Sequence, residues 1–447
     1  MPYWRLLSMG HVRTDGAARP HRAPAYAAGA VGVLAVLAYA SIYGRELAPT
    51  PVRSDAFSYY VYLPAVFIHG DPSLAAFASD CCGGQFPAYT VIIKWPGTGA
   101  WVNPHPIGVA VLVSPFFALA DLLARWGNLP RDGFWVLHTH LTGLAGPVYL
   151  VVGLLFVARV LARTFSPCVV ATTVVVLAFG TNLFHYATWD SLYSHVYAFC
   201  VLAALMAVLP PFYEAPSVRT AAVVGVLCGL TVLVRHLNVL LLLLVPLYGL
   251  LDRGAVRRRL EWAWQNRPAL ALTATTAACT VLPQLWLYYR ATGRWLVSPY
   301  GHLWFRFDDP RIVGVLFSTQ KGLFFWSPLL LVALAGVLVV RGEARAWVPP
   351  LLAIFPIQIY LVASWPDWQF GASYGHRAFT DDLALFAVPL AASLDWIAAS
   401  RRRRSAHVLV AMLVLLSAAQ MIQVWLGIMP MANVTWARYR ALFLRFS

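Results

Sequence analysis

Charged residues are scarce in this chain. Asp, Glu, Lys and Arg make up 11% of the 447 residues, whereas hydrophobic residues make up 60%. Because a soluble domain carries about 25% charge, this composition excludes a soluble enzyme. The ten-residue alternation of a membrane β-barrel is also absent. Apolar runs of about 20 residues recur from Tyr26 onward, each long enough to cross a bilayer core. The sequence therefore predicts an all-α, polytopic bundle of transmembrane helices.

Lysine is nearly missing as well. The chain has two lysines, Lys94 and Lys321, against 31 arginines, and its net charge is +15. A soluble protein with this balance would be expected to bind nucleic acid. In a membrane protein, the same excess reflects the positive-inside bias and contacts with anionic headgroups. We therefore expect the lipid bilayer as a partner and no nucleic acid.

Several motifs are absent too. The chain contains no Walker loop, no GxGxxG fingerprint, no HExxH and no CxxC, which makes a nucleotide-sugar donor unlikely to be used. Acidic residues are rare inside the apolar runs, which argues against an ion-coupled transporter. The six cysteines form no metal pattern. Cys81 and Cys82 are adjacent, and we expect them not to pair readily with each other.

The distribution of arginine predicts the topology. If the apolar run 104–123 does not cross the membrane, every short arginine cluster falls on the inner side, as the positive-inside rule requires. Pro104, Pro106 and Pro115 also fit an interfacial or re-entrant helix there. We therefore predict about eleven spans, with the N-terminus cytoplasmic. They are 26–43, 134–158, 168–186, 194–211, 218–234, 236–251, 269–289, 323–340, 346–364, 382–399 and 406–428.

This topology divides the chain into three parts. We expect a basic cytoplasmic N-terminus at 1–25, a transmembrane domain at 26–428 with a long first outer loop at 44–133, and a short tail at 429–447. The protein would be a multi-pass protein of the plasma (inner) membrane. Most acidic, His, Trp and Tyr residues fall in the outer loops, so chemistry is expected on the extracytoplasmic side.

Asp55 is the first candidate for catalysis. It follows the first span in an aromatic stretch that includes Tyr59 and Tyr60. A carboxylate held at the membrane surface can act as a general base. The alternative is an ordinary aspartate in the headgroup region.

The outer turn before residue 195 offers a second group of polar side chains. Asp190 lies there between His185 and His195. Together with Asp55, these residues could ligate a divalent metal. Their spacing matches no known ligand motif, and hydrogen-bonded histidines at a membrane interface are the alternative. The metal is left open, and none is required.

Two basic residues are candidates for binding a phosphate. Arg235 precedes His236 in a long apolar stretch, where a buried arginine costs about 2.5–3.5 kcal/mol. Lys321 lies at the mouth of a span, and its ammonium suits a phosphate oxygen. The alternatives are a tight turn that reaches the headgroups for Arg235 and an interfacial anchor for Lys321.

The last outer loop is rich in tryptophan. Aromatic faces next to polar groups suit a sugar ring, and its basic residues suit a sugar phosphate, although an aromatic belt would look similar. The candidate residues of this loop are Trp365, Asp367, Trp368, Tyr374, His376 and Arg377.

Taken together, these motifs resemble the polytopic GT-C glycosyltransferases, the superfamily of protein O-mannosyltransferases and aminoarabinose transferases. The resemblance rests on Asp55, the Asn103–Gly108 approach to the interfacial run, the turn ending in Asp190, and the segments 322–328 and 371–377. The chain departs from better-known members in two ways. It has a single acidic residue where a pair is usual, and it lacks their C-terminal soluble domain.

The resemblance implies a hexosyl- or pentosyltransferase that moves a sugar from a polyprenyl-phosphate donor to an acceptor glycan, lipid or protein, with inversion. Asp55 would be the base, and Asp190 would orient the acceptor or hold a cation. Arg235, Lys321 and Arg377 would neutralise the leaving phosphate. The other substrate-binding candidates are Tyr59, Tyr60, His105, His185, His195, His236, Trp365, Asp367, Trp368, Tyr374 and His376.

Two other classes stay open. One is a transporter or flippase for lipid-linked saccharides. The other is an O-antigen-ligase-like enzyme that uses a diphosphate donor.

Overall fold

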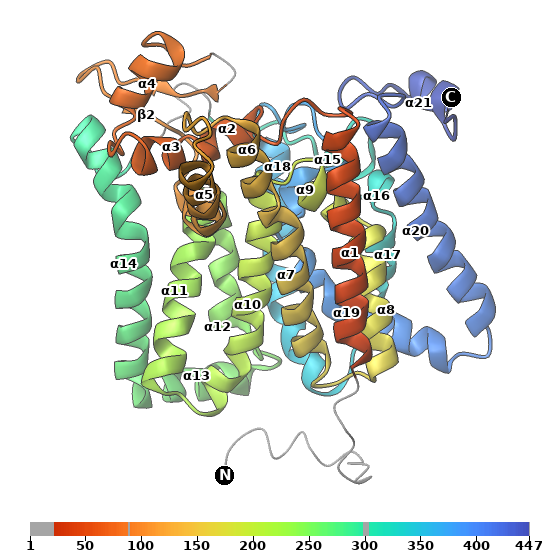
Figure 1. Cartoon of the computed structure of the whole chain (residues 1–447). Coiled ribbons are helices and arrows are strands. Elements are labelled where there is room, and N and C mark those ends of the chain that lie inside the picture. The colour runs from red at the N-terminus through yellow and green to blue at the C-terminus, as the bar shows by residue number, and fades with distance from the viewer. Residues whose placement is uncertain (1–21, 88–89, 298–303, 447) are drawn as a thin grey trace.

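Figure 1 shows the computed structural model of the protein, which describes residues 22–87, 90–297 and 304–446. Nearly every element in these residues is a helix. The one sheet among them is a two-stranded antiparallel pair, β1 (Ile93–Lys94) and β2 (Trp101–Val102). The predicted all-α fold is therefore confirmed. The predicted basic segment 1–25 lies almost wholly outside the described residues.

Helices that run along the bundle make up most of the structure. Seven of the described helices are long and apolar enough to cross a membrane, and four shorter apolar helices accompany them. The helices of the bundle and of its loops are α1 (Ala23–Gly44), α6 (Val136–Gly143), α7 (Ala145–Leu161), α8 (Pro167–Phe179), α9 (Leu183–Thr188), α10 (Ser194–Glu214), α11 (Val218–Val234), η3 (His236–Leu243), α12 (Leu244–Leu247), α13 (Arg253–Gln265), α14 (Arg267–Thr292), α15 (Ile312–Phe317), α16 (Leu323–Trp326), α17 (Leu329–Gly336), η4 (Gly342–Trp347), α18 (Val348–Ser364), η5 (Arg377–Phe379), α19 (Leu383–Ala399), α20 (Arg403–Trp425) and α21 (Trp436–Leu442).

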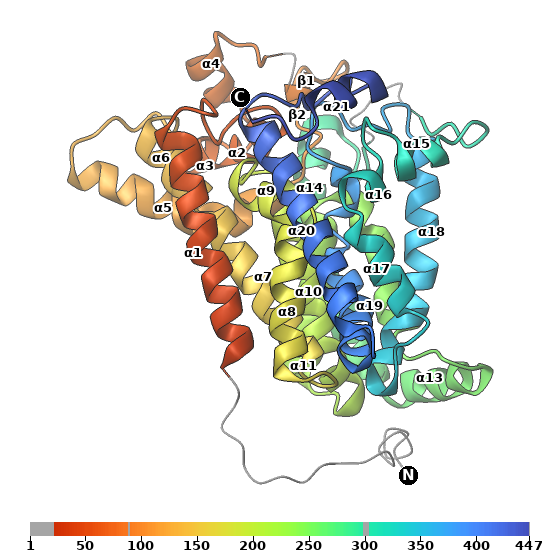
Figure 2. The same ribbon diagram turned by 90° about the vertical axis from the view of Figure 1, so that its right-hand side faces the viewer.

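The segment 44–133, predicted as the first outer loop, forms short helices above the bundle. They are α2 (Asp55–Tyr60), α3 (Tyr62–Phe67), α4 (Ala75–Cys82) and the longer α5 (Gly108–Trp126). Figure 2 shows α5 running across the long axes of its neighbours rather than along them. The orientation of α5 agrees with the predicted interfacial helix, and by its length and composition α5 could also span a membrane.

One predicted span is interrupted, and the predicted boundary between the spans 218–234 and 236–251 coincides with a break. The run 323–340 divides into α16 and α17, because Ser327 leaves the helical conformation just before Pro328. The apolar stretch around residue 235 breaks between α11 and η3, where Arg235 has extended backbone angles (φ −158°, ψ 123°). This break places a guanidinium between two helical segments instead of inside one.

Close backbone contact joins α11 to α14. Gly225 and Gly229 are four residues apart on α11, and a Cβ added at either would clash with Thr276 or Thr280 of α14. Such small residues let membrane helices approach each other closely. Because α14 is otherwise little buried, this seam fixes its position at the edge of the bundle.

The bundle has two different ends (Figure 1). The end that carries α2, α3, α4 and α21 is called the α2 face below, and the opposite end is called the α13 face. Loops at the α13 face carry the arginine clusters. Arg163, which follows α7, pairs there with Glu214 at the end of α10 and lies 3.4 Å from a carboxylate oxygen of Glu343 in η4.

Candidate functional site

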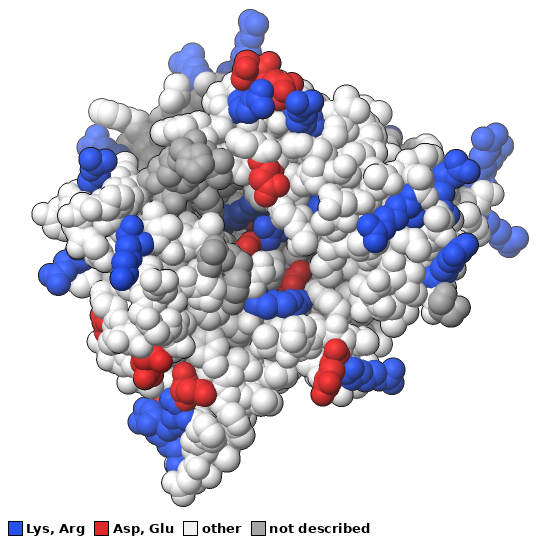
Figure 3. Space-filling view, turned by 90° about the horizontal axis from the view of Figure 1, so that it is seen from above, with Lys and Arg blue, Asp and Glu red and all other residues white. Residues whose placement is uncertain are grey.

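The α2 face is hollowed near its centre, and Figure 3 shows basic and acidic side chains gathered inside the hollow. Asp55 is the first residue of α2, and Arg377 begins η5. Arg377 Nη1 lies 2.6 Å from Asp55 Oδ2, although 322 residues separate the two in sequence. The Asp55 side chain is 27% exposed, so solvent and substrates can reach its carboxylate.

The charge state of Asp55 follows from this contact. Burial alone would raise the pKa of the carboxyl, but the charge and hydrogen bond of Arg377, together with His105 and His195, hold the pKa below its usual range. Asp55 is therefore ionised at neutral pH. A carboxylate paired in this way is a weak base until its partner is drawn away.

Phe370 separates two guanidinium groups. Its ring centroid lies 5.5 Å from Arg235 Cζ and 6.0 Å from Arg377 Cζ. Arg377 also lies over the Tyr193 ring at 5.6 Å. Phe370 has a positive φ of 53°, which is uncommon for a residue with a bulky side chain. The structure thus holds two cations close together on aromatic faces, an arrangement suited to a polyanion.

Arg235 is positioned by a buried acid. Its Nη1 lies 3.4 Å from Asp381 Oδ2, and the other oxygen of Asp381 lies 2.8 Å from His195 Nδ1. Asp381 and His195 are both buried. The predicted phosphate ligand Arg235 and the predicted substrate contact His195 therefore belong to one network.

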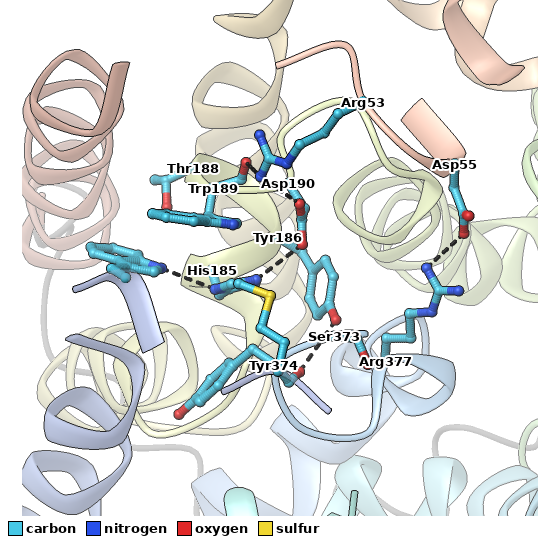
Figure 4. A network of polar contacts seen from close by, with 12 residues as sticks. Arg53, Asp55, His185, Tyr186, Thr188, Trp189, Asp190, Ser373, Tyr374 and Arg377 are labelled. Atoms are coloured by element: carbon cyan, nitrogen blue, oxygen red, sulfur yellow. Dashed lines mark hydrogen bonds and ion pairs between the residues drawn. The ribbon is translucent and has the colours of Figure 1, made fainter. Parts of the chain in front are cut away.

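Asp190 lies at the centre of a second network, shown in Figure 4. Arg53 Nη2 donates to Asp190 Oδ1 at 2.8 Å, and His185 Nε2 lies 3.0 Å from Oδ2. Trp425 Nε1 donates to His185 Nδ1 at 3.0 Å. Since an indole N–H can only donate, Nδ1 must accept, and the proton of the imidazole sits on Nε2. Both oxygens of Asp190 are thus taken, which favours a positioning role for this residue.

His105 borders the hollow on the side of Asp55. Its ring packs edge-on against Tyr59, with centroids 4.7 Å apart. Burial lowers the pKa of His105 to about 4, so the ring is neutral at pH 7. Its Nδ1 has no hydrogen-bond partner among the described residues. His236 lies farther along the same wall and packs against Tyr288, with ring centroids 6.0 Å apart.

Lys321 is buried beneath the tryptophan-rich loop. Its Nζ donates to the backbone oxygens of Ser373 and Met431, the latter at 2.5 Å. Burial, reinforced by the charge of Arg377, lowers the pKa of Lys321 to about 7. A neutral amine has two N–H donors, which match these two carbonyls. The third donor, which a phosphate would need, is present only in the protonated form.

The loop after α18 begins away from the hollow. Trp365 packs against Phe305, with ring centroids 5.1 Å apart. Asp367 is exposed at the surface. The Trp368 ring covers Gly314, where an added Cβ would lie 3.0 Å from the indole. These three predicted residues line the rim, and none touches Asp55.

The same loop turns inward at its end. Tyr374 is buried, donates to the backbone oxygen of Ser417 at 2.8 Å and lies 5.1 Å from the His185 ring. His376 packs against Phe370, with ring centroids 6.0 Å apart. Burial, with the charge of Lys321 next, lowers the pKa of His376 to about 3. His376 is therefore a neutral part of the floor of the site.

Tyr60 points away from the hollow. Its hydroxyl donates to the backbone oxygen of Gly133 at 2.5 Å, and its ring packs against Phe117 and Phe134. One helical step separates it from Tyr59, so the two side chains leave α2 on different sides. The predicted pair of substrate contacts is thus divided, with Tyr59 at the site and Tyr60 in the core of the first loop.

Sequence reasoning missed several residues of the site. Arg53 lies two positions before Asp55. Its positive charge could have suggested an ion pair with Asp190, which has the opposite charge. Asp381 follows Arg377 closely, but nothing in the sequence paired it with His195. No pattern marked Phe370 as the separator of two guanidinium groups.

The residues offered for a metal do not converge. His185 contacts Asp190, whereas His195 contacts Asp381. In the part of the chain that the structure describes, no three His, Cys, Asp or Glu side chains form a metal-binding group.

The expectation for the adjacent cysteines was wrong. Cys81 and Cys82 form a disulfide at the end of α4, on the α2 face. The turn at Gly83, with φ +58°, follows directly and lets the chain reverse after the bonded pair.

The fold and the site together define a class: a polytopic helical membrane fold with interfacial helices over one end and an acid–arginine site beneath them. No family model matches the chain, and no curated protein matches it in sequence. Among solved structures, the chain is similar to ArnT from Cupriavidus metallidurans, determined bound to undecaprenyl phosphate. The TM-score is 0.53 at 14% identity, and the alignment covers 90% of this chain and 65% of that one. The GT-C-like fold predicted from the sequence is thereby confirmed as a fold.

Proposed function

We propose that the protein is a membrane glycosyltransferase that moves a sugar from a polyprenyl-phosphate donor to an acceptor hydroxyl, with inversion. The observation that carries this proposal is the Asp55–Arg377 pair, set in a hollow on one end of an ArnT-like fold. The ArnT structure holds undecaprenyl phosphate, which supports a monophosphate lipid as the donor class.

The two guanidinium groups around Phe370 are the proposed phosphate site. Arg377 contacts Asp55 in the free protein, and a donor phosphate competes for the same guanidinium. When Arg377 turns toward the phosphate, Asp55 loses its main cationic partner and its pKa rises. Donor binding thus activates the base that the reaction needs.

The bond changes follow from these positions. Asp55 accepts the proton of the acceptor hydroxyl while the hydroxyl oxygen attacks the anomeric carbon. The bond between that carbon and the phosphate oxygen breaks, and the phosphate leaves with the electron pair. Arg235 and Arg377 stabilise its charge, and Lys321 adds a donor while it is protonated. Asp190 holds Arg53 and thereby the start of α2.

We further propose that the α2 face is extracytoplasmic. The arginine-rich loops lie at the α13 face, as the positive-inside rule requires of a cytoplasmic side. The disulfide of Cys81 and Cys82 lies at the α2 face, which fits an oxidising compartment. An alkylation assay on intact cells tests whether the α2 face is extracytoplasmic. A membrane-impermeant thiol reagent should label Cys81 and Cys82 after reduction but not before.

The central experiment is Asp55→Asn in detergent-purified protein, assayed with synthetic polyprenyl-phosphate sugars and envelope extract as the source of acceptors. Loss of a general base lowers turnover about 10²–10⁴-fold, and we expect a loss of that size. Asp80→Asn is the matched control, because Asp80 lies on α4 of the same face and its side chain is 74% exposed. Full activity of the Asp55→Asn variant would refute the base assignment.

Two further arms of this assay separate the alternatives. Product formation in detergent, without a sealed membrane, excludes a flippase, which makes no glycosidic bond. Comparison of monophosphate with diphosphate donors distinguishes the proposed reaction from that of an O-antigen-ligase-like enzyme.

A further inference from the structure

A second cavity opens on the α2 face, apart from the Asp55–Arg377 pair. It has a volume of about 320 Å³ and lies between the first outer loop and the C-terminal end of α14. That volume is at the lower end of the range for small-ligand pockets, about 300–1,000 Å³. Its polar and aromatic lining includes Asp71, Trp101, Gln284, Trp286, Tyr288 and Arg290.

Gln284 is a buried amide in the lining of this cavity. The residue is 1% exposed, and its Oε1 accepts the backbone N–H of Ile107 at 2.8 Å. Its Nε2 makes no hydrogen bond of regular geometry among the described residues, and the Tyr62 hydroxyl is the group it interacts with. A ligand oxygen that gave this buried amide a hydrogen bond of good geometry would be favoured, because a poorly satisfied buried donor is costly.

Flat aromatic and charged groups surround that donor. The Trp286 side chain is 46% exposed, and the Arg290 guanidinium lies 5.6 Å from its ring centroid. On the other wall, Lys94 Nζ lies 4.9 Å from the ring of Trp101. Asp71 offers carboxylate oxygens, which also accept the N–H groups of Ser73 and Ala76 and so are fixed in direction.

We propose that this cavity binds a saccharide, the non-reacting part of the acceptor. The inference rests on the proposed glycosyl transfer and adds that the acceptor is a glycan. Sugar rings present apolar faces that stack on indoles and hydroxyls that pair with amide, carboxylate and guanidinium groups. The lining supplies each of these, whereas an acyl chain would offer no polar atom to Gln284 Nε2 or to the Asp71 carboxylate.

The cavity is coupled to the candidate active site through one short loop. Asn103 lines the cavity and donates to the backbone oxygen of Ser58 in α2 at 2.7 Å. Tyr62 also lines it and donates to the backbone oxygen of His105 at 3.3 Å. A glycan bound there would contact residues that are hydrogen-bonded to α2 and to the segment that carries His105.

The test measures saccharide binding to the full-length protein in detergent. The probe is a glycan array of mono- to hexasaccharides built from hexoses, pentoses and N-acetylhexosamines. We expect a subset to bind, with binding at least about fivefold weaker in Trp286→Ala and in Gln284→Glu. Gln284→Glu keeps an acceptor for Ile107 and replaces the amide NH₂ group with a carboxyl oxygen. Trp264→Ala, on the exposed side of α13 at the other end of the molecule, is the control and should bind as wild type.

The outcomes separate this inference from the proposed function. Binding that survives Asp55→Asn but falls in Trp286→Ala and Gln284→Glu supports the cavity as the saccharide site, whatever the activity of the Asp55 variant. If no saccharide binds, the inference is overturned. It is also overturned if binding is lost in Asp55→Asn and unchanged in both cavity variants, because the saccharide then occupies only the hollow.

Discussion

Asp190→Asn gives the sharpest test of how the site is held in place. The two oxygens of Asp190 accept from two donors, Arg53 Nη2 at 2.8 Å and His185 Nε2 at 3.0 Å. Asparagine has the same shape but only one acceptor oxygen. Because Trp425 fixes the proton of His185 on Nε2, the new amide must turn its NH₂ group toward one of two donors. A donor would then face a donor in a buried site.

The size of the effect follows from burial. The Asp190 side chain is 5% exposed and the Arg53 side chain 21%. Removing one partner of a buried ion pair costs about 3–5 kcal/mol. Arg53 keeps bonds to the backbone oxygens of Thr50 and Trp189, both at 2.7 Å, so we expect the lower end of that range. Equilibrium unfolding of the purified protein in mixed micelles measures the loss.

A second substitution tests the tautomer argument itself. Trp425→Phe removes the donor to His185 Nδ1 and by itself should cost about 1 kcal/mol. In the double variant, His185 can move its proton to Nδ1 and accept from the new amide. The double variant should therefore be more stable than the sum of the single effects predicts, by about 1–2 kcal/mol. Strictly additive losses would refute the assigned tautomer.

The pH dependence checks the same pair. Burial would raise the pKa of Asp190, but Arg53 and His185 together hold it below its usual range. A depressed folded pKa gives stability that is present above the unfolded value, about 3.9, and is lost as the pH falls through the folded value. The difference in the free energy of unfolding between wild type and Asp190→Asn should thus be constant near neutral pH and should become smaller in acid.

Three other predictions test separate parts of the structure. The pKa of Lys321 is lowered to about 7, so above that pH the unfolded chain binds more protons than the folded one. The free energy of unfolding should therefore rise toward pH 9 by up to about 1.4 kcal/mol per pH unit. Thermal unfolding of Lys321→Met should not show this rise. A Cβ at Gly336 would clash with a backbone oxygen of α19, so Gly336→Ala should cost about 1–3 kcal/mol, whereas Gly29→Ala, which meets nothing within 4 Å, should not destabilise the protein. Phe370→Leu removes the ring between two guanidinium groups and should raise the KM for the donor several-fold in the transfer assay, while an unchanged KM would contradict the proposed phosphate site.

Much of the fold could be predicted because lipid leaves few alternatives. Apolar runs of spanning length had to be helices, and the arginine clusters had to share one side. That argument also predicted that 104–123 does not cross, and α5 runs across the long axes of its neighbours. The break at Ser327 could not be placed, because apolar residues on both sides give the same composition whether the helix continues or not.

The site could be predicted only in part, because its contacts join distant segments. Asp55, Arg235 and Arg377 carry charges that a membrane protein rarely tolerates without use, and they meet in the hollow. The residues that pair with them could not be predicted. His195 and Asp381 are 186 residues apart, and neither hydropathy nor spacing contains that pairing. The disulfide between Cys81 and Cys82 was not predicted, because adjacent cysteines do not usually have the geometry that a disulfide needs and the local backbone conformation was unknown from the sequence.

The stretch 53–55 now has a clearer role than a carboxylate after a span. Arg53 and Asp55 carry opposite charges, and each pairs with a different segment, Arg53 with Asp190 and Asp55 with Arg377. Ser54 between them has φ +49°, which turns the two side chains toward separate partners. The Arg53–Asp190 pair is more buried than the Asp55–Arg377 pair, and Arg53 also donates to the backbone oxygen of Trp189. We therefore expect the Arg53–Asp190 pair to persist when a phosphate draws Arg377 away. One pair therefore fixes the start of α2, and the other is the pair that the proposed mechanism requires to exchange partners.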